Sequence, residues 1–182
     1  MTSLNAQDTP LPLREIPAAP ESYSSGSVLA RMIEGLGYRY YWATEGLREE
    51  DLTYKPSEDA RNTGETLDHL LGLSFAVYCS AKSIPRESKD LGELSLEEKR
   101  RMTLENLAQA AEMLRGKTEA EVAELSIVFK RGENESEFPY WNMINGPIAD
   151  AIYHTGQVVS FRRASGNPMN PGVNVFTGKT RE

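Results

Sequence analysis

Apolar residues in this chain recur at three- and four-residue intervals over several long stretches, and this spacing limits the fold more than any other feature. In the first stretch, which begins at Ser24 or Ser25, the apolar positions are Leu29, Met32, Ile33, Leu36, Tyr40, Ala43 and Leu47. Such spacing places apolar side chains on one face of an α-helix. A serine at the start and Gly46 near the end are typical helix boundaries.

Two further helices are predicted from their capping residues. Asn62 and Glu65 have the spacing of a capping box, and the helix that follows runs to about Lys82. Ser95 and Glu98 form a second capping box, which opens a helix that continues toward Gly116. The segment between the first two helices, "LREEDLTYKPSEDA", is predicted to be a linker because its proline blocks a helix.

The fourth helix contains the segment "GPIADAIYHTGQVVSFRRA". Pro147 fits the first turn of a helix. If the helix already begins at Trp141, the same proline should kink it. Arg162 and Arg163 fall in the predicted last turn, where cations complement the helix dipole. In contrast, Lys99, Arg100 and Arg101 come early in the third helix next to acids, which indicates a solvated face.

Four long helices with apolar faces predict an all-α fold, a four-helix bundle over residues 23–168. A short hairpin before the last helix is predicted from two extended pieces on either side of Gly132. Residues 1–22 carry four prolines and are predicted to be an extended arm or a disordered tail. Residues 169–182 are predicted to form a C-terminal tail.

The composition excludes several classes of partner. The net charge is -7 and no basic cluster is evident, which argues against a nucleic-acid partner. No apolar run is long enough to cross a membrane, and the first residues do not have the pattern of a secretory signal. Cys79 is the one cysteine, lies in an apolar run and is predicted to be buried; its lack of a disulfide partner favours a cytoplasmic location.

The chain has two histidines, and both fall in apolar helical segments. Asp150 and His154 are four residues apart, so a helix places them on one face, where both can reach one metal ion. A bundle can bring His69 opposite this pair. Each residue also has a plainer interpretation: His69 as a core histidine, Asp150 as a first-turn acid, and the pair as an ordinary surface contact.

Two of these segments resemble the DinB-like (DinB/YfiT) superfamily of four-helix bundles: "TLDHLLGL" in the second helix and "HTGQVVSFRRASGNP" in the fourth. The linker after the first helix is similar as well. Members of that family carry three histidines on a divalent metal. The resemblance implies that His69 and His154 match two of these ligands, while Asp150 replaces the third. Gln157, on the face of His154, is expected to orient a ligand or a bound water.

The resemblance implies a metal-dependent enzyme that acts on a small molecule. The expected reaction is thiol S-transfer or isomerisation, or hydrolysis. The metal is expected to be zinc or nickel, with iron and manganese as alternatives. No general base is assigned, although Glu65 lies one turn before His69. The alternative function is a non-catalytic binding or stress protein with a structural or lost metal site. Dimers are usual in the proteins that it resembles, so a homodimer is expected.

Overall fold

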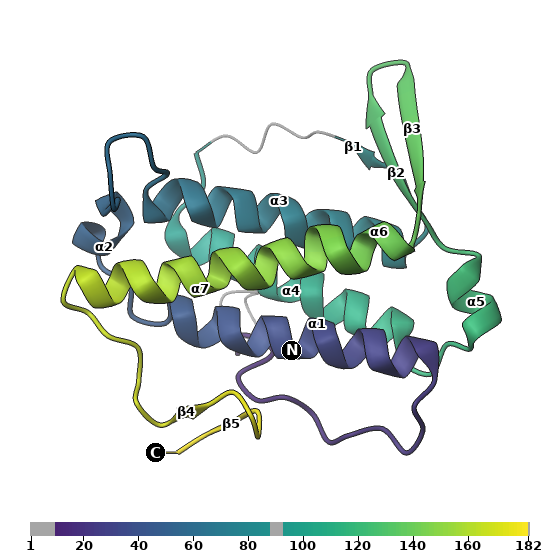
Figure 1. The fold of residues 1–182 in the computed structure, drawn as a ribbon, viewed down its shortest axis with the longest axis horizontal. Coiled ribbons are helices and arrows are strands. Elements are labelled where there is room, and N and C mark those ends of the chain that lie inside the picture. The colour runs from purple at the N-terminus through teal and green to yellow at the C-terminus, as the bar shows by residue number, and fades with distance from the viewer. Residues whose placement is uncertain (1–9, 88–92, 182) are drawn as a thin grey trace, which may run out of the picture.

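The structure is a computed structural model that describes residues 10–87 and 93–181. The helices are α1 (Ser25–Thr44), α2 (Glu49–Thr53), α3 (Thr63–Ala81), α4 (Leu96–Leu114), α5 (Glu119–Ala123), α6 (Trp141–Met143) and α7 (Ala149–Ala164), with a π-helical turn, η2 (Ile144–Ile148), between the last two. The long helices α1, α3, α4 and α7 lie side by side (Figure 1). Of these, α4 and α7 each pack against both α1 and α3.

The helices begin where the predicted caps lie. Asn62 and Glu65 exchange hydrogen bonds between side chain and backbone, each 2.8 Å long, at the start of α3. Ser95 caps α4 in the same way together with Glu98. Ser24 accepts a hydrogen bond at the start of α1. Because each cap satisfies backbone N–H groups that lack a partner within the helix, these local signals determine where the long helices begin.

The core lies between the long helices and is built from the apolar faces that the spacing predicted. Its deeply buried members include Ile33, Leu36, Leu67, Val77, Leu104, Leu107, Leu114, Met143, Ile148 and Val158. The prediction for Cys79 is confirmed, because its side chain is buried. Tyr38, Tyr40 and Trp42 are also buried, and Tyr40 belongs to the core. Its burial raises the pKa of Tyr40 to about 12.

The helical path into α7 is interrupted. Helical structure already begins at Trp141, so Pro147 lies inside the path rather than at its first turn. Gly146 has non-helical angles, with φ -94° and ψ -108°, and the chain passes through the turn η2 before α7 begins. A proline removes a backbone hydrogen bond and displaces the preceding turn. The kink therefore sets the direction in which α7, with Asp150 in its first turn, crosses α3.

Besides the helices, the fold contains short strands. The predicted hairpin is confirmed as β2 (Ser126–Arg131) and β3 (Asn134–Pro139), which pair in antiparallel register. A further strand, β1 (Arg86–Glu87), joins β2 in parallel. The backbone of the chain after α3 thus forms hydrogen bonds with the edge of the hairpin. Local sequence patterns do not show this pairing, because its two segments are distant in the chain.

The segment between α1 and α3 is not an unstructured linker. It contains α2, whose Asp51 carboxylate is buried and accepts hydrogen bonds from Arg48, Ser165 and Asn167. Burial favours a raised pKa for Asp51, but these hydrogen bonds outweigh it and hold the pKa well below the usual range. These contacts join α2 to the end of α7. Pro56 lies after the end of α2 and therefore does not prevent this short helix.

The described part of the N-terminal arm lies along the helices. Trp42 in α1 donates a hydrogen bond of 3.1 Å to the carbonyl oxygen of Arg14. The backbone N–H of Ile16 donates to the carbonyl oxygen of Gly178, in the turn between strands β4 (Val173–Asn174) and β5 (Lys179–Thr180). The predicted C-terminal tail therefore contains a small hairpin that holds the arm. Residues 1–9 lie outside the described part of the chain.

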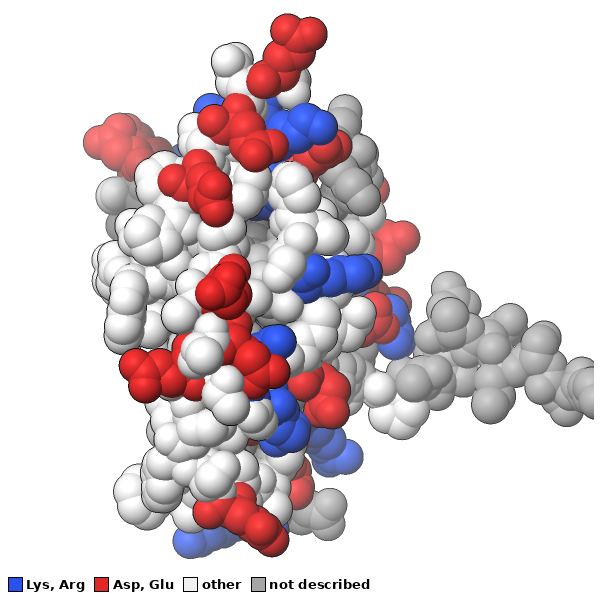
Figure 2. Space-filling view, turned by 90° about the vertical axis from the view of Figure 1, so that its right-hand side faces the viewer, with Lys and Arg blue, Asp and Glu red and all other residues white. Residues whose placement is uncertain are grey.

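Charged side chains of both signs are interspersed on the face that Figure 2 shows. The prediction of a solvated face at the start of α4 is partly wrong. Arg100 crosses to the end of α1, where it donates to the Thr44 hydroxyl and the Tyr41 carbonyl and pairs with Glu45. Within residues 10–87 and 93–181, no helix is long and apolar enough to span a bilayer.

Candidate metal centre

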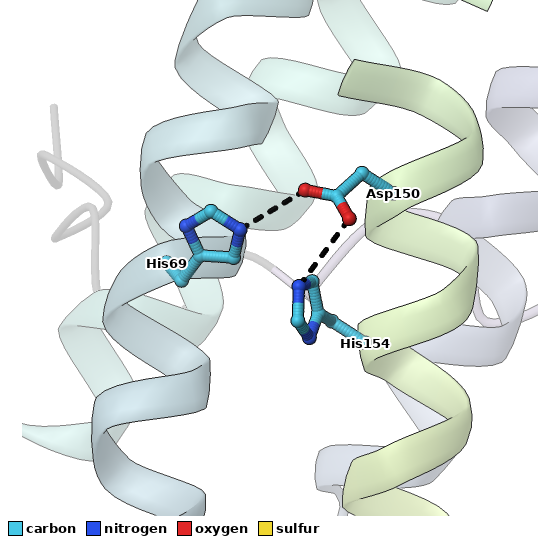
Figure 3. Close-up of side chains that lie close together, drawn as sticks. All are labelled: His69, Asp150 and His154. Carbon is cyan, nitrogen blue, oxygen red and sulfur yellow. Dashed lines mark hydrogen bonds and ion pairs between the residues drawn. The ribbon is translucent and has the colours of Figure 1, made fainter. Parts of the chain in front are cut away.

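Helix α7 places Asp150 and His154 on one face. The two residues are four positions apart, and Nε2 of His154 lies 3.3 Å from Oδ1 of Asp150. The helical repeat predicted that the two residues share a face, because positions i and i+4 lie about one turn apart. The pair points from α7 toward α3 (Figure 3).

Helix α3 supplies the third member of the group. Nε2 of His69 lies 3.0 Å from Oδ2 of Asp150, so the two oxygens of the carboxylate face one imidazole ring each (Figure 3). The ring centres of the two histidines are 4.6 Å apart. One ligand atom from each of the three residues lies within 4.8 Å of the other two. The structure thus brings together the three residues that the sequence singled out.

The group is partly open to solvent. The side chain of Asp150 is 42% exposed and that of His69 is 32% exposed, while that of His154 is 14% exposed. A metal held here would therefore be reachable from outside the protein. Such access is typical of catalytic sites, whereas structural sites are closed by protein ligands.

The second ring nitrogen of His154 has its own partner. Nδ1 of His154 lies 2.7 Å from Oε1 of Gln157, one turn further along α7. An amide oxygen only accepts, so Nδ1 carries the proton and Nε2 keeps its lone pair in the neutral ring. That lone pair then faces a carboxylate oxygen of Asp150, which is also an acceptor. Two acceptors at this distance repel each other unless a proton or a cation lies near both.

The donor set therefore fits a divalent transition metal. Two imidazoles and one carboxylate are common ligands of zinc, nickel, iron and manganese. Two ligands that are each about 2.1 Å from a tetrahedral metal lie roughly 3.4 Å apart. Oδ2 of Asp150 lies 3.0 Å from Nε2 of His69 and Oδ1 lies 3.3 Å from Nε2 of His154, so each oxygen stands at about this distance from one imidazole.

Gln157 was expected to orient a ligand or a bound water, and its side chain lies against His154. Tyr153 was not predicted to lie near the site. Its ring centre is 5.2 Å from that of His154, and the residue is 64% exposed. Glu65, one turn before His69, had no assigned catalytic role, and its carboxylate accepts from the Asn62 backbone in the predicted capping box. The capping spacing was the signal for that role.

The aromatic residues near the two ends of the long helices are divided between the core and a separate cavity. The segment at residues 38–42 is largely core, since Tyr38, Tyr40 and Trp42 are buried. Tyr140 and Trp141 instead line a cavity of about 520 Å³ between α1, α5 and the start of α6. The lining of this cavity does not include His69, Asp150 or His154.

Comparisons with known proteins support the fold. No family model matches the sequence, and no curated protein matches it. A crystal structure of a DinB-like protein, YjoA, from Bacillus subtilis is similar, with a TM-score of 0.56 and 12% sequence identity. The similarity covers 76% of this chain and 92% of that one. At this identity the likeness is one of fold, and this chain has the fold of a DinB-like protein, as its motifs in α3 and α7 predicted.

Proposed function

We propose that His69, Asp150 and His154 bind a divalent transition metal and that the protein is a metal-dependent enzyme acting on a small molecule. The observation that carries the proposal is the convergence of three ligand atoms, from two helices, to within 4.8 Å of one another. The metal is zinc or nickel, with iron and manganese as alternatives. The substrate reacts by thiol S-transfer or isomerisation, or by hydrolysis.

An enzyme is favoured over a protein with a purely structural metal because the described part of the chain offers three ligands and leaves the group partly exposed. A structural zinc site normally has four protein ligands. When bound, the metal supplies a Lewis acid that polarises a coordinated substrate group or water. Because one ligand is a carboxylate, the net charge of the site is lower by one than with three histidines, which favours harder metals somewhat.

The side chains of this group have distinct roles in the proposal. Asp150 offers one carboxylate oxygen beside Nε2 of His69 and the other beside Nε2 of His154. Gln157 fixes the proton of His154 on Nδ1, so that Nε2 faces the centre of the group. Tyr153 is exposed beside His154 and offers an aromatic edge to a substrate.

We also propose that the helices α1, α3, α4 and α7 form a four-helix bundle, which their mutual packing supports. The protein is cytoplasmic, which is supported by the buried thiol of Cys79 and by the absence of any other cysteine from the sequence. It forms a homodimer, an expectation that rests on the resemblance and that sedimentation of the full chain tests.

The test of the metal site is the metal content of tag-free protein, measured by mass spectrometry after purification and again after reloading. Wild type is compared with Asp150→Asn and His154→Ala. The control is Asp68→Asn, which makes the same chemical change on α3 at a carboxylate paired with Lys99. We expect one metal per chain in wild type and in the control, and a large loss in both site variants.

Wild-type protein that stays free of metal after reloading would contradict the proposal. So would site variants that keep as much metal as wild type. If the metal is present and the site variants lose it, screens for thiol transfer and for hydrolysis follow. Catalysis is then attributed to the site only if turnover disappears in His154→Ala and remains in Asp68→Asn.

A further inference from the structure

Arg86 reaches the helix that carries His69. It is the first residue of β1, and its Nη2 atom lies 3.6 Å from the position that a Cβ atom on Gly72 would occupy. Gly72 is three residues after His69 in α3, so the two positions are neighbours on the helix surface, about 5–6 Å apart. The guanidinium of Arg86 therefore packs against α3 at a position about one helical turn along from His69.

The strand pairing explains why this side chain lies there. β1 pairs in parallel with β2, with Arg86 opposite Phe129. The carbon at the centre of the guanidinium is 5.8 Å from the centre of the Phe129 ring. Strand and ring thus hold the side chain between the hairpin and α3, and this restriction reduces the entropy lost when it binds a ligand.

The guanidinium has no polar partner among the residues that the structure describes. Its Nε atom is buried and donates no hydrogen bond within residues 10–87 and 93–181. In the same part of the chain, no carboxylate lies within 4 Å of it, whereas the neighbouring Lys130 pairs with Glu87 at 2.9 Å. A buried donor without a partner is unfavourable, and such groups in native proteins call for an explanation such as a ligand.

We propose that the substrate of the metal site carries a carboxylate, which Arg86 binds while another group of the same molecule reaches the metal. The inference rests on the proposed function, because it takes His69, Asp150 and His154 as the metal ligands. Arginine is suited to this role because its planar fork matches the two oxygens of a carboxylate. Because Gly72 and His69 lie within about one turn of each other on α3, roughly 5 Å along the helix, the substrate that reaches both groups is a small molecule.

The test uses the full chain loaded with Co²⁺, whose absorption spectrum changes when a thiol coordinates it. Two probes are titrated: 3-mercaptopropionate and its methyl ester, which keeps the thiol but has no negative charge. The proteins are wild type, Arg86→Gln and the control Arg131→Gln, which removes the same charge from the exposed end of β2. Arg86→Lys is a further variant, which keeps the charge and loses the planar fork.

We expect wild type and Arg131→Gln to bind the carboxylate probe at least about tenfold more tightly than the ester, as a charge-assisted contact implies. Arg86→Gln should load with Co²⁺ normally but bind both probes equally, and Arg86→Lys should keep part of the preference. Normal Co²⁺ loading of the variant shows that its helices are correctly assembled.

The outcomes separate this inference from the proposed function. Equal binding of the two probes by Co²⁺-loaded wild type would overturn the role of Arg86 and leave the metal site intact. A preference for the carboxylate that persists in Arg86→Gln would also overturn it, because another group must then bind the carboxylate. A wild-type chain that does not bind Co²⁺ would overturn the proposed function and this inference with it.

Discussion

Nδ1 of His154 lies 2.7 Å from Oε1 of Gln157, three residues further along α7. This hydrogen bond assigns the proton of the neutral imidazole to the nitrogen that faces away from Asp150. The nitrogen that faces Asp150, Nε2, is then free to bind a metal ion. Partners of this kind orient metal-binding histidines and influence affinity without touching the metal.

We therefore expect Gln157→Leu to lower metal affinity by about 10- to 100-fold without unfolding the protein. Competition with a chromophoric chelator measures the dissociation constant of Zn²⁺. The control is Gln109→Leu, the same change at an exposed position of α4, which should leave the affinity unchanged. Equal affinities in wild type and Gln157→Leu would show that the hydrogen bond does not contribute to binding.

Metal binding should also stabilise the fold, because the ligands are brought together only when α3 and α7 are packed. At a free metal concentration of 100 times the dissociation constant, the free energy of unfolding should rise by about 2.7 kcal/mol. Urea unfolding with and without Zn²⁺, followed by addition of a chelator, measures this change. Asp150→Asn should largely lose the increase. An increase of the same size in that variant would place the binding site elsewhere.

The buried carboxylate of Asp51 should make stability depend on pH. Burial opposes its ionisation, yet the hydrogen bonds from Arg48, Ser165 and Asn167 hold its pKa below the unfolded value of about 3.9. A lowered folded-state pKa means that the contribution is fully present above about pH 4. It is lost as the pH falls from there through the folded-state pKa.

We expect Asp51→Ala to lower the free energy of unfolding near pH 7 by about 3–5 kcal/mol, because it leaves buried donors without their partner. The difference from wild type should shrink as the pH falls below about 4. Urea unfolding between pH 3 and 7 measures both effects. Asp59→Ala, at an exposed position, is the control and should change the free energy little. A difference that is constant over the whole range would contradict the assigned ionisation.

Two glycines in long helices should respond in opposite directions to alanine. A Cβ atom on Gly26 would lie 2.1 Å from the Leu114 carbonyl oxygen and 2.7 Å from the Lys117 backbone nitrogen. Because both are backbone atoms, α1 must shift away from the end of α4. Gly26→Ala should therefore lower the free energy of unfolding by about 1–3 kcal/mol.

Gly156→Ala is the matched comparison, since Gly156 lies in α7 and a Cβ atom there would meet nothing within 4 Å. Alanine is preferred over glycine within helices, so this variant should be more stable by about 0.5–1 kcal/mol. Urea unfolding measures both variants. If Gly26→Ala is as stable as wild type, the close approach of α1 to the end of α4 is not required for the fold.

Much of the fold was predictable because its signals are local. The capping box of Asn62 and Glu65 and that of Ser95 and Glu98 each lie within four residues, and so does the spacing of Asp150 and His154. Such features depend on backbone geometry that every helix shares. Beyond these signals, the motifs around His69 and His154 indicated the DinB-like fold, which the likeness to the Bacillus subtilis protein confirms.

Other features depend on residues far apart in the chain and were not predicted. The segment that contains α2 was predicted to be a linker. The helix was missed because the contacts that stabilise it come from the end of α7. Arg100 was taken for a solvated side chain, yet its partners are at the end of α1. Strand β1 forms only because the β2–β3 hairpin offers it an edge.

The candidate site divides in the same way. The sequence by itself determined that Asp150, His154 and Gln157 share one face of α7, because this follows from the helical repeat. Only the tertiary structure decided that His69 meets Asp150 at 3.0 Å and that Arg86 lies against Gly72. These contacts depend on how α3 packs against α7 and against the hairpin, and such packing arises from many weak contacts between distant segments, which no local pattern encodes.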